Sequence, residues 1–198
     1  MLYHFFRAIL AVLLRMFFRL KVEGLENLPR QGNFIVVANH ASYLDPLALG
    51  VAIPRKIHWI AVRQIFNCVW IRWFMWGTKV LPTGGSSQKS LFLLEHNKNV
   101  GLFPEGTRTH DGEMKEFRNG AAVLALKTGR PIVPCAVVGA YEAFPRTAKM
   151  PRLLPIKVKI GKPIFALKRF EDTLETRHLQ DTTFRIAKAI KELLNEKQ

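Results

Sequence analysis

The stretch FIVVANHASYLD, residues 34–45, holds the features from which the fold and the chemistry of this chain are best predicted. Its first half, residues 34–38, is an apolar and β-branched run with polar residues on both sides, which is typical of a short buried strand. Residues 44–51 continue in a short helical pattern. In α/β sheets the reactive residues usually follow directly after strand ends. The polar residues after Ala38 are therefore candidates for a functional site.

The rest of the chain alternates short apolar runs with helical patterns. Further strands are predicted at residues 57–62, 79–82, 100–103, 132–138 and 156–160, and helices at residues 86–98, 117–128 and 173–196. Strands that alternate with helices indicate an α/β domain with helices packed on the sheet. No internal repeat and no linker rich in Gly, Ser or Pro divides the sequence. We therefore predict one α/β domain over residues 22–198, with a mixed sheet flanked by helices.

Residues 1–21 are predicted to form an amphipathic helix that anchors the chain to a membrane. A spanning helix needs about 20 consecutive apolar residues, and the charge-free run at residues 8–14 is too short. On a helical wheel, one arc is basic: His4, Arg7, Arg15 and Arg19. The opposite side is apolar: Phe5, Ile9, Leu13, Met16, Phe17 and Leu20. This pattern favours a helix in the membrane interface with its arginines at the headgroups. The alternative is a helix packed on the protein's own core.

The chain is strongly basic, with 30 Lys and Arg against 15 Asp and Glu and a formal charge of +15. An excess of this size favours an anionic partner such as nucleic acid, an anionic membrane or a phosphorylated substrate. The 14 Phe residues are many for a soluble nucleic-acid binder. Cys68 and Cys135 form no Cys-x-x-Cys pair, so neither a metal site nor a redox motif is predicted. Two reduced thiols fit a protein that faces the cytoplasm.

The first polar cluster combines a histidine with a carboxylate, His40 and Asp45. Histidine is the side chain whose ordinary pKa lies nearest neutrality, which suits a general base. Residues five apart do not share a straight helix face. A turn between them would let Asp45 accept the proton on the far ring nitrogen and stabilise the imidazolium, as in a hydrolase triad. The alternative is that His40 caps a strand and Asp45 caps the next helix.

The second polar cluster is FPEGTR, residues 103–108, which also follows a predicted strand. Arg108 offers a planar fork that matches a phosphate in two-point contact. Thr107 can donate a hydroxyl hydrogen bond to the same group, and Gly106 permits close backbone approach by a ligand. The alternative is an ordinary surface turn in which Glu105 and Arg108 form an ion pair.

Together these clusters resemble the glycerolipid acyltransferase superfamily, and within it the bacterial lysophosphatidic acid acyltransferases of the PlsC type. Asn39, His40 and Asp45 match the family's first motif, residues 103–108 match its third at every position, and residues 132–134 correspond to its fourth. The resemblance covers roughly residues 22–165. It implies that His40 and Asp45 are catalytic and that substrate is bound by Glu105, Gly106, Thr107 and Arg108.

The second motif of the family departs from its usual form here. Thr83 stands where an arginine that binds the acceptor phosphate is expected. Lys79 or Arg63 is predicted to bind substrate in its place. The acyl chain needs an apolar groove, for which four aromatic residues are candidates, with a role in the core or the membrane interface as the alternative: Trp70, Trp73, Phe74 and Trp76.

The resemblance implies transfer of a fatty acyl chain from acyl-CoA or acyl carrier protein to the hydroxyl of lysophosphatidic acid, which gives phosphatidic acid for phospholipid biosynthesis. The expected partners are membrane lipids, a lysophospholipid acceptor and the acyl carrier, at the cytoplasmic face, without nucleic acid, metal or other cofactor. Glycerol-3-phosphate, another lysophospholipid or an aminolipid are alternative acceptors. A non-catalytic basic protein that binds membranes or nucleic acid is the alternative from another class. An acyl-enzyme on Ser42, Thr107 or Cys135 is the rival chemistry.

Overall fold

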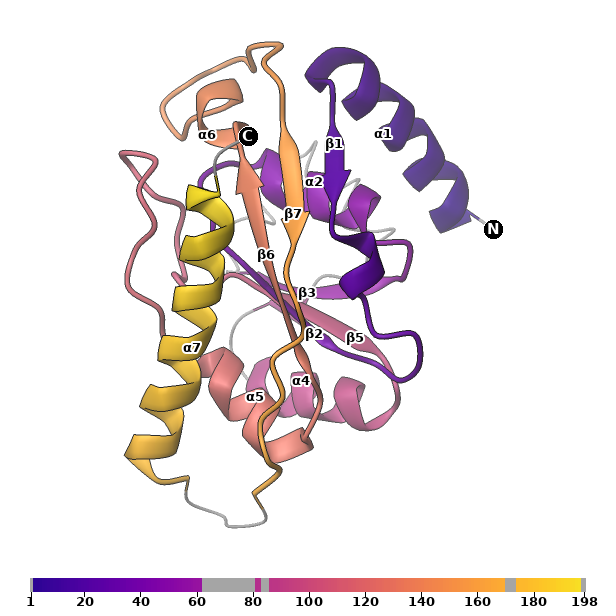
Figure 1. Cartoon of the computed structure of the whole chain (residues 1–198). Coiled ribbons are helices and arrows are strands. Elements are labelled where there is room, and N and C mark those ends of the chain that lie inside the picture. Colours follow the sequence, from indigo (N-terminus) through magenta and orange to yellow (C-terminus); the bar gives the residue numbers. More distant parts are fainter. Residues whose placement is uncertain (1, 62–80, 83–85, 170–173, 197–198) are drawn as a thin grey trace.

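The computed structural model describes residues 2–61, 81–82, 86–169 and 174–196 (Figure 1). In chain order its elements are α1 (Leu2–Phe18), β1 (Lys21–Glu23), the 3-10 helix η1 (Leu25–Asn27), β2 (Ile35–Ala38), α2 (Leu44–Ala52), β3 (Ile57–Ala61), β4 (Leu81–Pro82), α4 (Ser86–Glu95), β5 (Asn99–Leu102), α5 (Gly120–Thr128), β6 (Ile132–Val138), α6 (Ala140–Ala143), β7 (Lys157–Ile160) and α7 (Thr176–Asn195).

Three predicted helices are shorter in the structure than their sequence patterns indicated, and one of them is α7, which spans Thr176–Asn195 instead of residues 173–196. Helix α4 ends at Glu95 instead of residue 98, because Asn97 takes a left-handed conformation with φ 54° and ends the helical path. Helix α5 begins at Gly120 instead of residue 117. The chain before it stays extended, because Phe117 is buried in the core and the Arg118 N–H donates to the Pro104 carbonyl at 3.0 Å.

The strands form a seven-stranded sheet in the order β1-β7-β6-β2-β5-β3-β4. Strand β7 is antiparallel to β6 and parallel to β1, whereas the remaining neighbours pair in parallel, so the predicted mixed sheet is confirmed. Strand β2 lies between β6 and β5 and is buried along its whole length. Because Val37 of β2 pairs with Leu102 of β5, the two strands end together. The two polar clusters therefore follow the carboxyl ends of two neighbouring strands, at the same end of the sheet.

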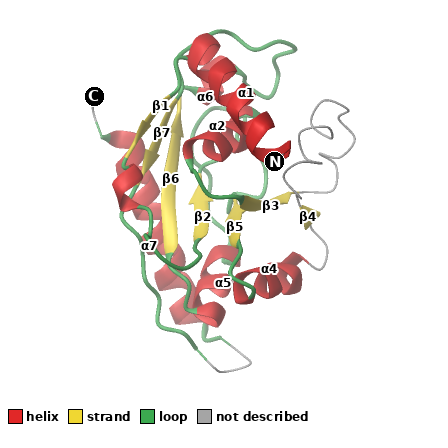
Figure 2. Cartoon of the chain, turned by 90° about the vertical axis from the view of Figure 1, so that its right-hand side faces the viewer, coloured by secondary structure: helices red, strands yellow, loops and turns green. Residues whose placement is uncertain are grey.

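Helices cover both faces of the sheet and create two apolar cores (Figure 2). Residues alternate along β2, so Phe34, Val36 and Ala38 enter the core under α1, α2 and α6. Ile35 and Val37 enter the other core, under α4, α5 and α7. The chain therefore folds as a three-layer α/β/α domain, as its alternating pattern predicted.

Helix α1 packs on the domain with one face and leaves a second apolar face exposed. Leu14 and Phe18 are buried in the core beside α2. Arg7, which we predicted at the headgroups, donates instead to the carbonyls of Gly50 and Val51 at 3.1 and 2.7 Å, at the end of α2. The exposed apolar side chains are Phe5, Ile9, Val12, Leu13, Met16 and Phe17. The same helix thus packs on the core with one face and exposes a second apolar face.

Among the described residues, no helix combines the length and the apolar character that crossing a bilayer requires.

Candidate active site

The His40–Asp45 pair forms as the sequence predicted, through a turn between β2 and α2. Asp45 lies in the first turn of α2 and is 0% exposed. Its Oδ2 accepts hydrogen bonds from His40 Nδ1 at 2.9 Å and from the backbone N–H groups of Ala41 and Ser42, each at 2.7 Å. Because the carboxylate oxygen accepts at Nδ1, that nitrogen carries the ring proton. The other ring nitrogen, Nε2, is then the one with a lone pair for a substrate proton.

Aromatic rings hold the imidazole of His40 from its face. The His40 ring stacks on Phe103 with centroids 4.1 Å apart and planes at 17°. Phe103 in turn stacks on the buried ring of Trp59 at 5.1 Å and 8°. Asp45 therefore fixes the imidazole within its plane, and the Phe103–Trp59 stack fixes the plane itself. Sequence reasoning missed Trp59, because an aromatic residue in a strand gives no signal beyond that of the core.

Glu105, in the second cluster, binds the backbone of the first cluster through its carboxylate. Its Oε1 accepts the His40 N–H at 2.8 Å, and its Oε2 accepts the Lys115 N–H at 3.2 Å. The Thr109 N–H donates to the His40 carbonyl at 2.9 Å. Glu105 and Thr109 therefore hold the His40 backbone at both its N–H and its carbonyl. Burial raises the pKa of the Glu105 carboxyl above its ordinary value, although the two backbone donors act in the opposite direction. The substrate-binding role assigned to Glu105 stays a prediction.

Asn39, the first residue of the matched motif, binds the neighbouring strand with both ends of its side-chain amide. Its Nδ2 donates to the Val137 carbonyl at 3.1 Å, and its Oδ1 accepts the Val137 N–H at 2.8 Å. Strand β2 has ended at Ala38, so this side chain occupies the place of the next backbone group. Asn39 thereby fixes the point at which the chain turns toward His40.

Arg108 lies beside the first cluster with unused hydrogen-bonding capacity. Its guanidinium carbon is 3.4 Å from the centroid of the Tyr43 ring, and its buried Nη1 has no hydrogen-bond partner within the described residues. Burial lowers the pKa of Arg108 below its ordinary value. The ion pair with Glu105, which was the alternative interpretation, is not among those in the described part of the chain. Tyr43 was not predicted as part of the site, although it lies within the first cluster.

Gly106 and Thr107 form the turn between the motif's ends. Gly106 has φ +74°, a left-handed conformation that favours glycine, and its N–H donates to the Phe103 carbonyl at 3.1 Å. That N–H is thus engaged within the turn. Thr107 is exposed. Arg63 and Lys79 lie outside the described residues, as do Cys68, Thr83 and the four aromatic candidates for the acyl groove.

The two buried candidates for an acyl-enzyme are poorly placed to attack a thioester. The Ser42 hydroxyl donates to the Phe144 carbonyl at 2.8 Å and accepts the Leu44 N–H at 3.1 Å. Cys135 lies within β6 with 0% exposure, and burial raises the pKa of its thiol, which disfavours the thiolate. Direct transfer assisted by His40 fits this arrangement better.

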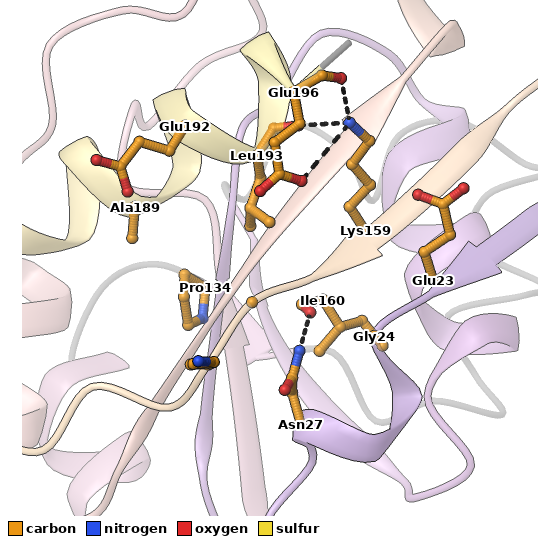
Figure 3. Close-up of a pocket in the computed structure, with 12 residues that line it drawn as sticks. Glu23, Gly24, Asn27, Pro134, Lys159, Ile160, Ala189, Glu192, Leu193 and Glu196 are labelled. Atoms are coloured by element: carbon orange, nitrogen blue, oxygen red, sulfur yellow. Dashed lines mark hydrogen bonds and ion pairs between the residues drawn. The ribbon is translucent and has the colours of Figure 1, made fainter. Parts of the chain in front are cut away.

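A cavity of about 390 Å³ lies between η1, β7 and α7, and none of the predicted site residues lines it (Figure 3). Its buried Lys159 donates from Nζ to the carbonyls of Leu193 and Glu196 at 2.9 and 2.8 Å. Figure 3 shows this side chain directed at the last turn of α7. A cation among the carbonyls of a helix C-terminus satisfies groups that lack partners within the helix. Lys159 therefore anchors α7 to the sheet.

Lys159→Met is expected to lower the free energy of unfolding by about 1–3 kcal/mol, because it removes charge-assisted hydrogen bonds from a buried site. Urea unfolding followed by circular dichroism measures the change. Lys162→Met is the matched control, because Lys162 lines the same cavity with an exposed side chain and should change stability by less than about 0.5 kcal/mol. Equal stability of the Lys159 variant and the native protein would contradict the anchoring role.

The fold and the site together define the class of this protein. The fold is a three-layer α/β domain, and the site pairs His40 and Asp45 with the loop that carries Arg108, at the carboxyl ends of β2 and β5. The chain belongs to the acyltransferase family, whose model matches residues 19–138. The predicted membership of the glycerolipid acyltransferase superfamily, PlsC type, is thereby confirmed.

Several relatives share the name 1-acyl-sn-glycerol-3-phosphate acyltransferase. The chain is 32% identical over 205 residues to the 1-acyl-sn-glycerol-3-phosphate acyltransferase of Bacillus subtilis, with 98% of each chain covered. It is 32% identical over 162 residues to a chloroplastic enzyme of the same name from Brassica napus, covering 77% of this chain and 47% of that one. The crystal structure of PlsC, a 1-acyl-sn-glycerophosphate acyltransferase from Thermotoga maritima, matches with a TM-score of 0.73 and 22% identity. That match covers 97% of this chain and 83% of the other, and shows the shared fold.

Proposed function

We propose that the chain is a 1-acylglycerol-3-phosphate O-acyltransferase, which moves a fatty acyl group from acyl-CoA or acyl carrier protein to lysophosphatidic acid. The observation that carries the proposal is the His40–Asp45 pair beside Arg108, whose buried Nη1 has no hydrogen-bond partner among the described residues. His40 can accept the proton of a hydroxyl, and Arg108 suits a phosphate. Lysophosphatidic acid carries both a free hydroxyl and a phosphate. The names of the relatives support the same acceptor.

The reaction proceeds by direct transfer. His40 Nε2 takes the proton of the acceptor hydroxyl while that oxygen attacks the thioester carbonyl. Collapse of the tetrahedral intermediate breaks the carbon–sulfur bond, and the leaving thiolate receives the proton from the imidazolium. Asp45 stabilises the imidazolium while it exists. Arg108 holds the acceptor phosphate, which places the hydroxyl for attack and lowers the entropic part of the barrier.

We propose that the exposed face of α1 binds a lipid surface at the cytoplasmic side. Phe5, Val12 and Met16 are 62%, 61% and 63% exposed. Arg15 and Arg19 are also exposed and suit anionic headgroups. Burial of these apolar side chains among lipid acyl chains would remove them from water, which is favourable.

The variant Phe5→Ser, Val12→Ser and Met16→Ser is expected to leave the membrane pellet for the soluble fraction while keeping its melting temperature. Each buried apolar side chain contributes roughly 1.5–3 kcal/mol to membrane binding. Vesicle sedimentation measures this binding. Leu14→Ala is the control: Leu14 lies in the core, so that variant should lose thermal stability and remain bound. For the same reason, deletion of the whole helix would confuse release with unfolding. Continued pelleting of the triple variant in high salt would contradict the proposed surface.

The decisive experiment presents the purified protein with a panel of acceptors and both thioester carriers, and identifies the lipid products by mass spectrometry. Acyl transfer to lysophosphatidic acid in preference to glycerol-3-phosphate, other lysophospholipids and aminolipids is expected. Preference for another acceptor would replace the proposed substrate, and no transfer to any of them would overturn the proposed activity. Comparison of the two carriers on the preferred acceptor identifies the donor.

A further inference from the structure

A second arginine, Arg146, reaches the loop that carries Arg108 from a distant part of the chain. It follows α6, and its Nη1 lies 3.2 Å from the Nε2 of His110. The His110 carbonyl in turn accepts the Tyr141 hydroxyl at 2.8 Å. The positive charge of Arg146 also helps to lower the pKa of Arg108, although burial is the larger cause. The guanidinium of Arg146 therefore contacts the segment that follows Arg108, close enough for the two charges to interact.

The segment that carries Arg146 is fixed directly to the loop of the catalytic histidine. Phe144, two residues before Arg146, accepts the Ser42 hydroxyl at its carbonyl at 2.8 Å. Its ring also contacts the ring of Tyr43, with centroids 6.1 Å apart. Tyr43 is the residue on which Arg108 stacks. The segment before Arg146 is therefore held against Tyr43, the residue on which Arg108 stacks.

Within the described part of the chain, no acidic side chain forms an ion pair with either arginine. Three carboxylates near this loop are engaged elsewhere. Asp45 accepts from His40 and two backbone groups, and Glu105 accepts from two backbone groups. Asp111 accepts from the Thr109 hydroxyl and the Glu113 N–H. Like charges held together disfavour each other unless an anion joins them. The pair is therefore arranged for an anion that comes with the substrate.

We propose that Arg146 is a second phosphate-binding residue, which clamps the phosphate of the acceptor together with Arg108. This inference rests on the proposed function and names a specificity determinant of the same site. The three terminal oxygens of a phosphate monoester offer contacts to two guanidinium forks approaching from different directions. Arg108 approaches from the loop after β5, and Arg146 from the connection between β6 and β7. The clamp selects acceptors with a terminal phosphate over those with a masked or missing one.

The test compares Arg146→Ala and Arg146→Lys with the native protein in steady-state acyl transfer, with acceptor and donor varied separately. Arg146→Ala is expected to raise the KM for lysophosphatidic acid by about 10-fold to 100-fold, as for the loss of a charge-assisted hydrogen bond. The donor KM should stay unchanged, and Arg146→Lys should recover part of the loss. Arg130→Ala is the control, because Arg130 precedes β6 at the opposite edge of the sheet and should leave both constants unchanged.

Octyl phosphate, which has a chain and a phosphate but no acceptor hydroxyl, provides a measurement that does not depend on turnover. Titration calorimetry should show weaker binding in Arg146→Ala by a similar factor, with the melting temperature unchanged. An unaltered Kd for octyl phosphate, or a change confined to the donor KM, would overturn the clamp while the proposed function stands. Absence of acyl transfer by the native protein would instead remove the proposed function, and the octyl phosphate titration would still decide the role of Arg146.

Discussion

His40→Ala is expected to lower kcat by about 10²-fold to 10⁴-fold, which corresponds to roughly 3–5 kcal/mol of activation free energy. The variant removes the ring whose Nδ1 is held by Asp45 and whose Nε2 is thereby oriented as a base. The KM values should change little, because binding depends on other groups. Turnover with saturating donor and acceptor measures the loss, and the melting temperature confirms that the variant folds.

Asp45→Asn separates the orientation of His40 from its charge stabilisation. An amide oxygen at the Oδ2 position still accepts the three N–H donors, and the amide nitrogen takes the place of Oδ1, which has no partner within the described residues. The fold and the ring position should therefore persist while much of the rate is lost, because a neutral amide stabilises the imidazolium less. A native rate in Asp45→Asn would show that the carboxylate is not needed for catalysis.

Rapid quenching with labelled acyl donor, in the absence of acceptor, distinguishes direct transfer from an acyl-enzyme. Direct transfer predicts a protein without label that still acylates the acceptor when it is added. Stoichiometric label on the protein would establish the covalent route, and its position would identify the nucleophile. Ser42 and Cys135 are the less suitable candidates because of their hydrogen bonds and burial, so Thr107 would be the first position to inspect.

Arg108→Lys is expected to raise the KM for the acceptor by about 10-fold or more while the donor KM is unchanged. Lysine keeps the charge but lacks the planar fork that contacts two phosphate oxygens, and it stacks less well on Tyr43. Arg55→Lys is the matched control, because Arg55 also lies over an aromatic ring, that of Phe34, at 5.5 Å but away from the site. An increase confined to the donor KM in Arg108→Lys would assign Arg108 to the carrier instead of the acceptor.

The contact between His40 and Asp45 was predictable from the sequence because the two residues are close in the chain. His40 and Asp45 lie on one turn between a strand and a helix, and the parallel pairing of β2 and β5 then places residues 103–108 beside them. The strand patterns were strong, because β2 and β6 are buried on both faces and read as continuous apolar runs. Local chemistry and regular patterns thus define the centre of the site.

The parts that sequence reasoning missed depend on contacts between distant segments. Strand β1 has only three residues, two of them charged and exposed, so no apolar run marks it. The guanidinium of Arg7 caps α2, a contact that no helical wheel of α1 can show. Trp59 and Tyr43 acquire their roles only when Phe103 and Arg108 are brought against them. Their sequence positions alone favour a core strand and a turn.

Asn39 illustrates how a motif residue can shape a site through the backbone of a neighbouring strand. Its side-chain amide imitates a peptide group, since it offers Val137 one donor and one acceptor at the spacing of a backbone partner. Aspartate would supply no donor, and glutamine would carry the same amide one methylene too far. The side chain of Asn39 therefore mimics the main chain: it adds one pair of backbone-like hydrogen bonds between β2 and β6, and the backbone itself turns toward His40.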